Sequence, residues 1–274
     1  MALVQIAKEQ SIITLLSRVA TLYGHMKITR LKDHTILKAA SAVSREYIAK
    51  CKTDNPEQDP SATKRESYAI ETLRAIGEVV DCIDQLHLSV DMLSGYKSRR
   101  VPNRMNRYDY IVFGIENYYL RLTAVFDRCL RLANATYQLG LPERQCNNDT
   151  IIKNSHVKGT PVAKPLKELD KFTEAFRFHR NRVAHQATYS EKDLYPLGAY
   201  YLLAEVDDSW KRYHYRYKKQ TDDFVTNRKA EFQRNVAKLE NLVEAYLDAL
   251  NAVFETRLKS YVGFPQKFTP QRKR

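Results

Sequence analysis

Residues 176–186, FRFHRNRVAHQ, bring an arginine, a small polar residue and a histidine together near the end of a helical pattern. Asn181 and His185 are four residues apart, so they would share one face of a helix, with Arg180 on the flank beside them. An imidazole can move protons near neutral pH, and a guanidinium can hold a phosphate through two parallel hydrogen bonds. Cleavage of a phosphodiester needs both abilities.

The spacing alone is a weak signal, because Arg and His pairs arise by chance in a basic chain of this length. A His with an Arg five residues before it, and a small polar residue directly after that Arg, occurs once, at Arg180 and His185. The alternative interpretation is a histidine at the end of a helix, where its cation interacts with the negative end of the dipole.

The segment RNRVAH resembles the motif of the HEPN superfamily, the higher-eukaryote and prokaryote nucleotide-binding domain: Arg, a small polar residue, three variable residues and His. The preceding segment, YYLRLTAVFDRCLRLANATYQLGL, is similar to a subfamily of bacterial HEPN proteins. The resemblance covers roughly residues 107–260 and does not extend to residues 1–60. It implies an all-α fold, a HEPN-like helical bundle with additional N-terminal helices.

The resemblance also implies a metal-independent endoribonuclease, with no cofactor, of the kind found in toxin–antitoxin, abortive-infection and CRISPR systems. Arg180 and His185 would be the catalytic pair, and Asn181 would orient or support them. The ribose 2′-hydroxyl would attack the adjacent phosphate and leave a 2′,3′-cyclic phosphate and a 5′-hydroxyl, so DNA would not be cut. Because one motif supplies one histidine, we expect a homodimer that brings two motifs together.

Further residues are expected around this motif. Glu116, Arg121, Asp127 and Arg128 lie on the helix expected to face it, and the resemblance implies that Asp127 and Arg128 support the motif. The alternative is a surface ion pair between Asp127 and Arg131, which is favoured for Arg131. Side chains expected to contact RNA lie beside the motif and in the segment KRYHYRYKK, where rings alternate with cations. They are Arg177, His179, Arg182, Lys211, Arg212, Tyr213, Tyr215 and Arg216. Plain surface exposure is the alternative for Arg177 and His179, and an extended edge or a tyrosine-rich helix start is the alternative for residues 211–219.

The composition agrees with a globular protein that attracts polyanions. Lys and Arg number 45 against 32 Asp and Glu, a formal charge of +13, although charge of this kind also simply promotes solubility. Glycine-rich phosphate loops and dinucleotide-binding patterns are absent. The four cysteines lack metal-ligand spacing and are expected to be reduced and structural. No apolar run is long enough to cross a membrane, so we expect no membrane partner and a cytoplasmic location.

Apolar residues recur at three- and four-residue intervals, which predicts the helices that must position the motif. The expected helices are 3–23, 29–51, one from Ser61 or Thr63 to Leu93, 107–139 ended by Gly140, 166–186, and 222–262. Residues 142–165 are expected to form a long polar connection. The expected organisation is N-terminal helices over 1–95, possible members of the same bundle, a HEPN-like domain over 96–264 and a basic tail over 265–274.

Two other classes of function remain open from the sequence. The first is a non-catalytic helical module that binds RNA, a nucleotide or a partner protein, since fold does not fix function. The second is a structural scaffold, in which His185 would be buried or would point away from any basic groove. If the chain is a ribonuclease, it needs an antitoxin or another regulatory partner to restrain it.

Overall fold

The structure is a computed structural model, and it describes residues 29–53, 61–97, 105–185 and 188–261. Every regular element in these ranges is a helix, as the sequence predicts. No helix in the same ranges is long and apolar enough to cross a membrane. The expected helix 3–23 lies outside the described residues. The α-helices are α2 (Thr35–Thr53), α3 (Lys64–Met92), α4 (Arg107–Tyr137), α5 (Asn148–Ile152), α6 (Ala163–His185), α7 (Tyr195–Val206) and α8 (His214–Ser260), and the 3-10 helices are η1 (Arg30–Asp33), η2 (Glu143–Gln145) and η3 (Asp208–Tyr213).

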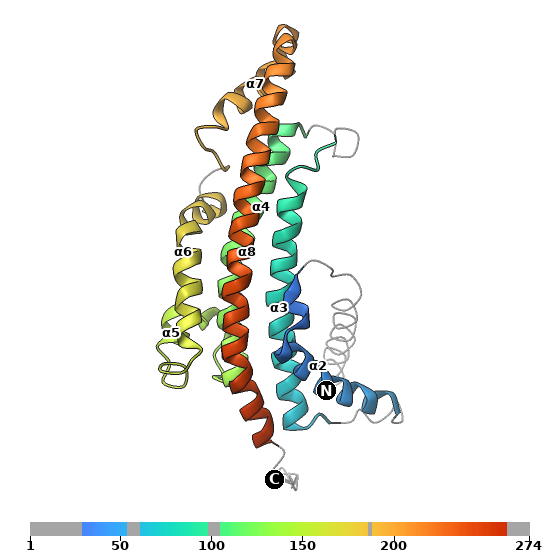
Figure 1. Cartoon of the computed structure of the whole chain (residues 1–274), viewed down its shortest axis with the longest axis vertical. Helices are drawn as coiled ribbons and strands as arrows, with labels where there is room; N and C mark the ends of the chain where they lie inside the picture. Colours follow the sequence, from blue (N-terminus) through green and yellow to red (C-terminus); the bar gives the residue numbers. More distant parts are fainter. Residues whose placement is uncertain (1–28, 54–60, 98–104, 186–187, 262–274) are drawn as a thin grey trace, which may run out of the picture.

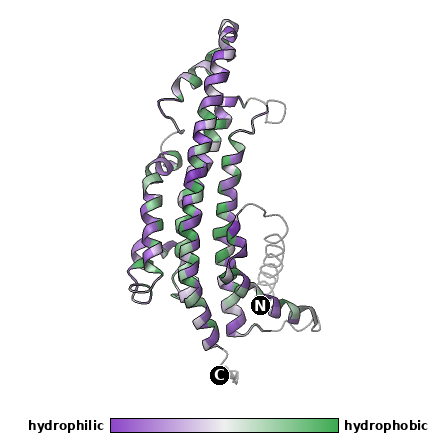
Figure 2. Cartoon of the chain, in the orientation of Figure 1, coloured by the Kyte–Doolittle hydropathy of each residue, from purple (hydrophilic) through white to green (hydrophobic). Residues whose placement is uncertain are grey.

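Three long helices, α3, α4 and α8, run side by side along the long axis of the molecule (Figure 1). Helix α6 packs against α4 and α8, and α7 lies with the first turns of α8 at one end, where it also contacts α4 (Figure 1). Figure 2 shows hydrophobic and hydrophilic positions alternating along each long helix. This pattern lets each helix bury one side in a core that all the long helices share.

Helix α4 is the central element of this core. The side chains that recur at three- and four-residue intervals along its sequence are all buried: Ile111, Ile115, Tyr118, Leu122, Val125, Cys129, Leu132 and Thr136. Burying a large apolar side chain contributes about 1.5–3 kcal/mol, so this seam is a main source of stability. The helix ends at Tyr137, where Gln138 takes a left-handed conformation with φ of 49°. It therefore ends before Gly140, two residues earlier than predicted.

Helix α8 forms the wall opposite α3 and α4. Tyr118 of α4 stacks on Phe232 of α8 with ring centroids 3.5 Å apart and planes 4° apart. The predicted start at residue 222 is wrong, because the helix begins at His214 and has 47 residues, about 70 Å at 1.5 Å per residue. The first turns are almost entirely exposed and so carry no apolar repeat that would reveal them.

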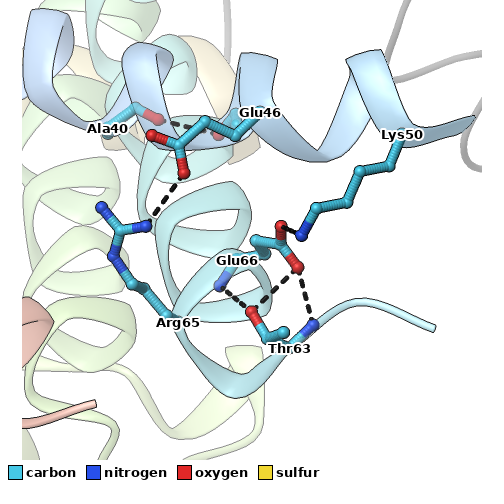
Figure 3. Close-up of polar contacts among 7 residues, drawn as sticks. Ala40, Glu46, Lys50, Thr63, Arg65 and Glu66 are labelled. Carbon is cyan, nitrogen blue, oxygen red and sulfur yellow. Dashed lines mark hydrogen bonds and ion pairs between the residues drawn. The ribbon is translucent and has the colours of Figure 1, made fainter. Parts of the chain in front are cut away.

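Helix α3 begins at the predicted cap. Thr63 accepts a hydrogen bond from the backbone N–H of Glu66 (3.2 Å), and the Glu66 carboxylate accepts one from the backbone N–H of Thr63 (2.8 Å). The same carboxylate pairs with Lys50 of α2 (2.5 Å), and Arg65 pairs with Glu46 of α2 (2.9 Å), as Figure 3 shows. The start of α3 therefore also fixes α2 against the bundle.

The first described residues are tied to the same bundle. Thr29 donates from its backbone N–H to Asp84 Oδ1 of α3 (3.0 Å) and from its hydroxyl to Glu240 Oε1 of α8 (2.6 Å). Leu31 of η1 is buried in the common core. The predicted helix 29–51 is thus replaced by η1 and α2, and these elements pack with the bundle.

The connection between α4 and α6 differs from the expected polar loop. It contains η2 and α5, and four of its apolar side chains are buried in the core: Ile151, Ile152, Val157 and Val162. Burial of these residues, together with turn hydrogen bonds such as that from the Val157 N–H to the Asn154 carbonyl (3.0 Å), holds this long connection against the bundle. It is a packed part of the fold.

All four cysteines are free, as expected. Cys82 and Cys129 are buried, and burial raises the pKa of both thiols. Thiols in this environment stay protonated and pack as small apolar side chains.

Candidate functional site

The motif residues occupy the last two turns of α6. Arg180 is half-buried, Asn181 and His185 are exposed, and His185 is the last residue of the helix. One guanidinium nitrogen of Arg180 donates to Asn181 Oδ1 at 2.8 Å. This contact orients the guanidinium and leaves its other N–H groups available to an anionic ligand.

Arg177 shows which side of α6 faces α4. Its guanidinium lies over the ring of Phe126 of α4, 5.9 Å from the centroid, and pairs with Asp170 (2.8 Å) and Glu174 (2.5 Å). Arg180 is three residues further along and so lies on the same side of the helix. The charge of Arg177, expected to contact RNA, is therefore already balanced by two carboxylates within α6.

His179 is part of the contact between α6 and α4. Its ring stacks on Tyr119 of α4 with centroids 4.6 Å apart and planes 16° apart, and the side chain is half-buried. Burial lowers its pKa, and the nearby Glu191 opposes that change only in part. The structure thus places this side chain in a packing layer, where the sequence had suggested an RNA contact or plain surface exposure.

The chain that follows the motif is anchored to two helices. Glu116 of α4 accepts a hydrogen bond from the backbone N–H of Tyr189 (2.7 Å), and the Tyr189 hydroxyl donates to Glu191 (2.9 Å). Glu191 in turn pairs with Arg228 of α8 (2.5 Å), which also pairs with Glu231 (2.9 Å). This network holds Tyr189 and Glu191 in place against α4 and α8.

Arg228 keeps its charge in this half-buried position. Burial acts to lower its pKa, but Glu191 and Glu231 outweigh that effect and the pKa is raised. Sequence reasoning singled out Glu116 but missed Tyr189, Glu191 and Arg228. No motif marks these residues, because they come together only when α4, α8 and residues 188–191 pack. Arg182 adds another tie to the same segment through Ser190 Oγ (3.3 Å).

Two arginines expected to support the motif lie elsewhere on α4. Arg121 donates to Gln85 of α3, and Arg128 donates to the Ala124 carbonyl within its own helix (3.2 Å). Helix α6 packs on a different side of α4 from α3, so the Arg121 side chain points away from the motif helix. Asp127 is half-buried, and Arg131 pairs with Glu143 (2.5 Å) and not with Asp127, which was the alternative interpretation.

The basic and aromatic segment 211–219 spans the end of η3 and the start of α8. Tyr217 stacks on Tyr200 of α7 with centroids 4.2 Å apart, which matches the alternative of a tyrosine-rich helix start. Tyr215 is 82% exposed, and Arg212 lies over the ring of Tyr213 at 4.8 Å. Lys211 pairs with Asp208 (2.6 Å), and Arg216 lies 6.0 Å from the Tyr217 centroid. Rings and cations are thus presented at the projecting end of the molecule.

A comparison with family models matches residues 78–257 to the Cthe2314-like HEPN family, which is more than half of the chain. The chain belongs to the HEPN superfamily. The matched region runs from within α3 to near the end of α8, so the HEPN match includes α4, the motif in α6 and the network around Arg228. Neither the curated proteins nor the solved structures include a match to this HEPN chain.

Proposed function

We propose that the protein is a metal-independent endoribonuclease that cuts single-stranded RNA. The observation that carries the proposal is the placement of Arg180, Asn181 and His185 at the end of α6 in a HEPN chain, with Asn181 and His185 open to solvent. His185 moves the proton between the 2′-hydroxyl and the leaving group, and Arg180 stabilises the charge that develops on the phosphate. Asn181 positions Arg180 through their hydrogen bond.

We propose that two copies combine to form the complete site, because each motif offers one imidazole while the reaction uses an acid and a base. Support comes from exposed apolar side chains on α4 and on the motif helix. Phe113 (52% exposed) and Leu120 (39%) lie three residues before and four after Glu116 on α4. Phe178 (70% exposed) lies one and two turns before Asn181 and His185. A two-fold contact through these side chains would bring the two motifs close together.

The cellular role follows from the chemistry that we propose. A ribonuclease with broad access to RNA harms its own host, so the activity requires a trigger or a restraining partner. We therefore infer a role in a toxin–antitoxin system or in defence against phage.

The test compares purified wild type with His185→Ala on labelled RNA without added metal, followed by analysis of the end groups. His156→Ala is the matched control, because His156 is also exposed but lies in the connection between α5 and α6. We expect cyclic phosphate and 5′-hydroxyl ends from wild type and His156→Ala, and a loss of at least about a hundredfold for His185→Ala.

Equal cleavage by wild type and His185→Ala would contradict the role given to His185. Binding of RNA without cleavage by any of the three proteins would instead favour the non-catalytic module. DNA of the same sequence should remain intact, because it lacks the attacking hydroxyl.

A further inference from the structure

A groove of about 800 Å³ opens between α8 and the segment that joins α6 to α7. Its size falls within the range of about 300–1,000 Å³ that is usual for small-ligand sites. Lys192 and Asp193 form one rim, and Phe224, Arg228 and Arg234 of α8 form the other. Lys192 is two residues after Ser190, which accepts the hydrogen bond from Arg182 of the motif helix. The segment that forms this rim is therefore tied to the motif helix two residues before Lys192.

One wall of the groove is flat and held firmly. The guanidinium of Arg228 lies over the Phe224 ring, 5.5 Å from its centroid, and is fixed by its ion pairs with Glu191 and Glu231. Phe224 is half-buried, so it is supported from below while part of its ring lines the groove. Aromatic rings and guanidinium planes are the surfaces on which unpaired bases stack.

The charges of the rim fit a phosphate. Lys192 and Arg234 are exposed, and neither forms an ion pair with any residue in the described parts of the chain. Arg228, by contrast, is already balanced by two carboxylates. The two unpaired cations are therefore the groups that a phosphate would contact. Asn227 and Asp193 add an amide and a carboxylate that can read base edges or a ribose hydroxyl.

We infer that this groove binds one nucleotide of the RNA strand that the motif cuts. The base lies against Phe224 and Arg228, and Lys192 and Arg234 hold its phosphate. The inference rests on the proposed function and assigns to it a site of substrate recognition separate from Arg180 and His185. None of the groove residues moves a proton in the reaction, so the groove acts on affinity and on choice of sequence.

The test measures equilibrium binding of a labelled 2′-O-methyl RNA strand of roughly eight nucleotides, which cannot be cut because it lacks the attacking hydroxyl. For Arg234→Ala we expect about tenfold weaker binding and a decrease of about 0.7 in the slope of log affinity against log salt, the value for one phosphate contact on a single strand. For Phe224→Leu we expect binding at least about fivefold weaker, with the salt slope unchanged.

Arg74→Ala on α3 is the matched control, because it removes the same charge from an exposed position near the other end of α4. Circular dichroism checks that each variant is folded. Binding weakened equally by Arg74→Ala and Arg234→Ala would overturn the inference, because attraction would then come from net charge alone. Unchanged binding by Arg234→Ala and Phe224→Leu, or no binding by wild type, would also overturn it.

Failure of the groove inference can be distinguished from failure of the proposed nuclease activity. If wild type binds the strand through Phe224 and Arg234 but cuts no RNA, the groove stands and the catalytic proposal fails. If wild type cuts RNA while both groove variants bind and cut as well as wild type, the groove assignment fails and the catalytic proposal stands.

Discussion

The two halves of α8 differ sharply in what surrounds them. From Phe232 to Phe254 the helix buries one residue in nearly every turn against α3, α4 and α6, including Val236, Leu239 and Val243. From His214 to Arg228 only Thr221 and Val225 are buried, and the contacts include a ring stack of Tyr217 on Tyr200 of α7 and an ion pair of Asp222 with Arg107 of α4. One half is therefore fixed by packing, while the other is free to present its side chains to a ligand.

The candidate site lies where one half gives way to the other. Arg228 and Glu231 stand at that junction and connect to Tyr189 and Glu191 behind the motif helix. A rigid bundle thus supports the candidate catalytic groups, and the groups themselves lie at its edge. Binding and catalytic residues commonly occupy such positions, where a packed scaffold meets exposed segments.

The largest expected difference between the halves concerns stability. Phe232→Ala removes a ring stacked on Tyr118 in the core and should lower the free energy of unfolding by about 3–5 kcal/mol. Tyr215→Ala, in the exposed half, should change it by less than about 0.5 kcal/mol. Denaturant unfolding followed by circular dichroism measures both. Similar losses for the two variants would mean that the first turns of α8 are packed against something in solution.

A smaller effect is expected at the junction itself. Arg228→Met keeps most of the side-chain volume but leaves Glu191 and Glu231 without their cation, at a cost of about 1.5–3 kcal/mol. Because Glu191 holds Tyr189 behind the motif, RNA cleavage should fall by more than the loss of folded protein explains. Arg228→Lys keeps the positive charge but not the forked geometry of the guanidinium. It should therefore recover only part of the lost stability and only part of the lost RNA cleavage. Full activity of Arg228→Met in folded protein would show that the network does not position the motif.

The smallest expected effect is on the loss of folding stability at acidic pH. Burial acts to raise the pKa of Glu240 in the packed half, but hydrogen bonds from His87 and Thr29 outweigh it, and the pKa lies below its ordinary value of 4.5. Glu240 therefore stabilises the fold above that value, and this contribution is lost as the pH falls through the folded-state pKa.

Unfolding measured between about pH 6 and pH 3 tests this point. Glu240→Gln should show less loss of stability on acidification than wild type, by about 1 kcal/mol. Thr29→Val, which removes one of the hydrogen bonds, should lie between them. An unchanged dependence in Glu240→Gln would show that other carboxylates govern the acid sensitivity.

The sequence predicted the packed half better than the exposed half, for a physical reason. Burial imposes an apolar repeat, so the seams of α4 and of α8 from Phe232 onward were readable from spacing alone. The first turns of α8 bury almost nothing and so leave no repeat, and their helical state became visible only in the structure. The connection with Ile151 and Val157 was misread because its few apolar residues are scattered between polar ones.

The motif could be found in the sequence for a different reason. Its residues lie within six positions on one helix, so chemistry and spacing could be judged together. The supporting groups come from α4, α8 and residues 188–191, and no sequence distance relates Glu116 to Tyr189 or Glu191 to Arg228. Arg121 shows what a helical repeat cannot predict. The repeat gives the face of the helix on which a side chain lies, but it does not say which neighbouring helix that face contacts.

The hydrogen bond between Thr29 and Glu240 joins residues 211 positions apart, and α8 closes the core that α3 and α4 begin. On a ribosome, α3 and α4 can pair early, because they are neighbours in the chain, whereas α8 is synthesised only after α6. The core on which the motif helix rests is thus completed only after the motif itself has been made. A nascent chain would therefore carry Arg180 and His185 for some time before the helix that supports them is packed in place.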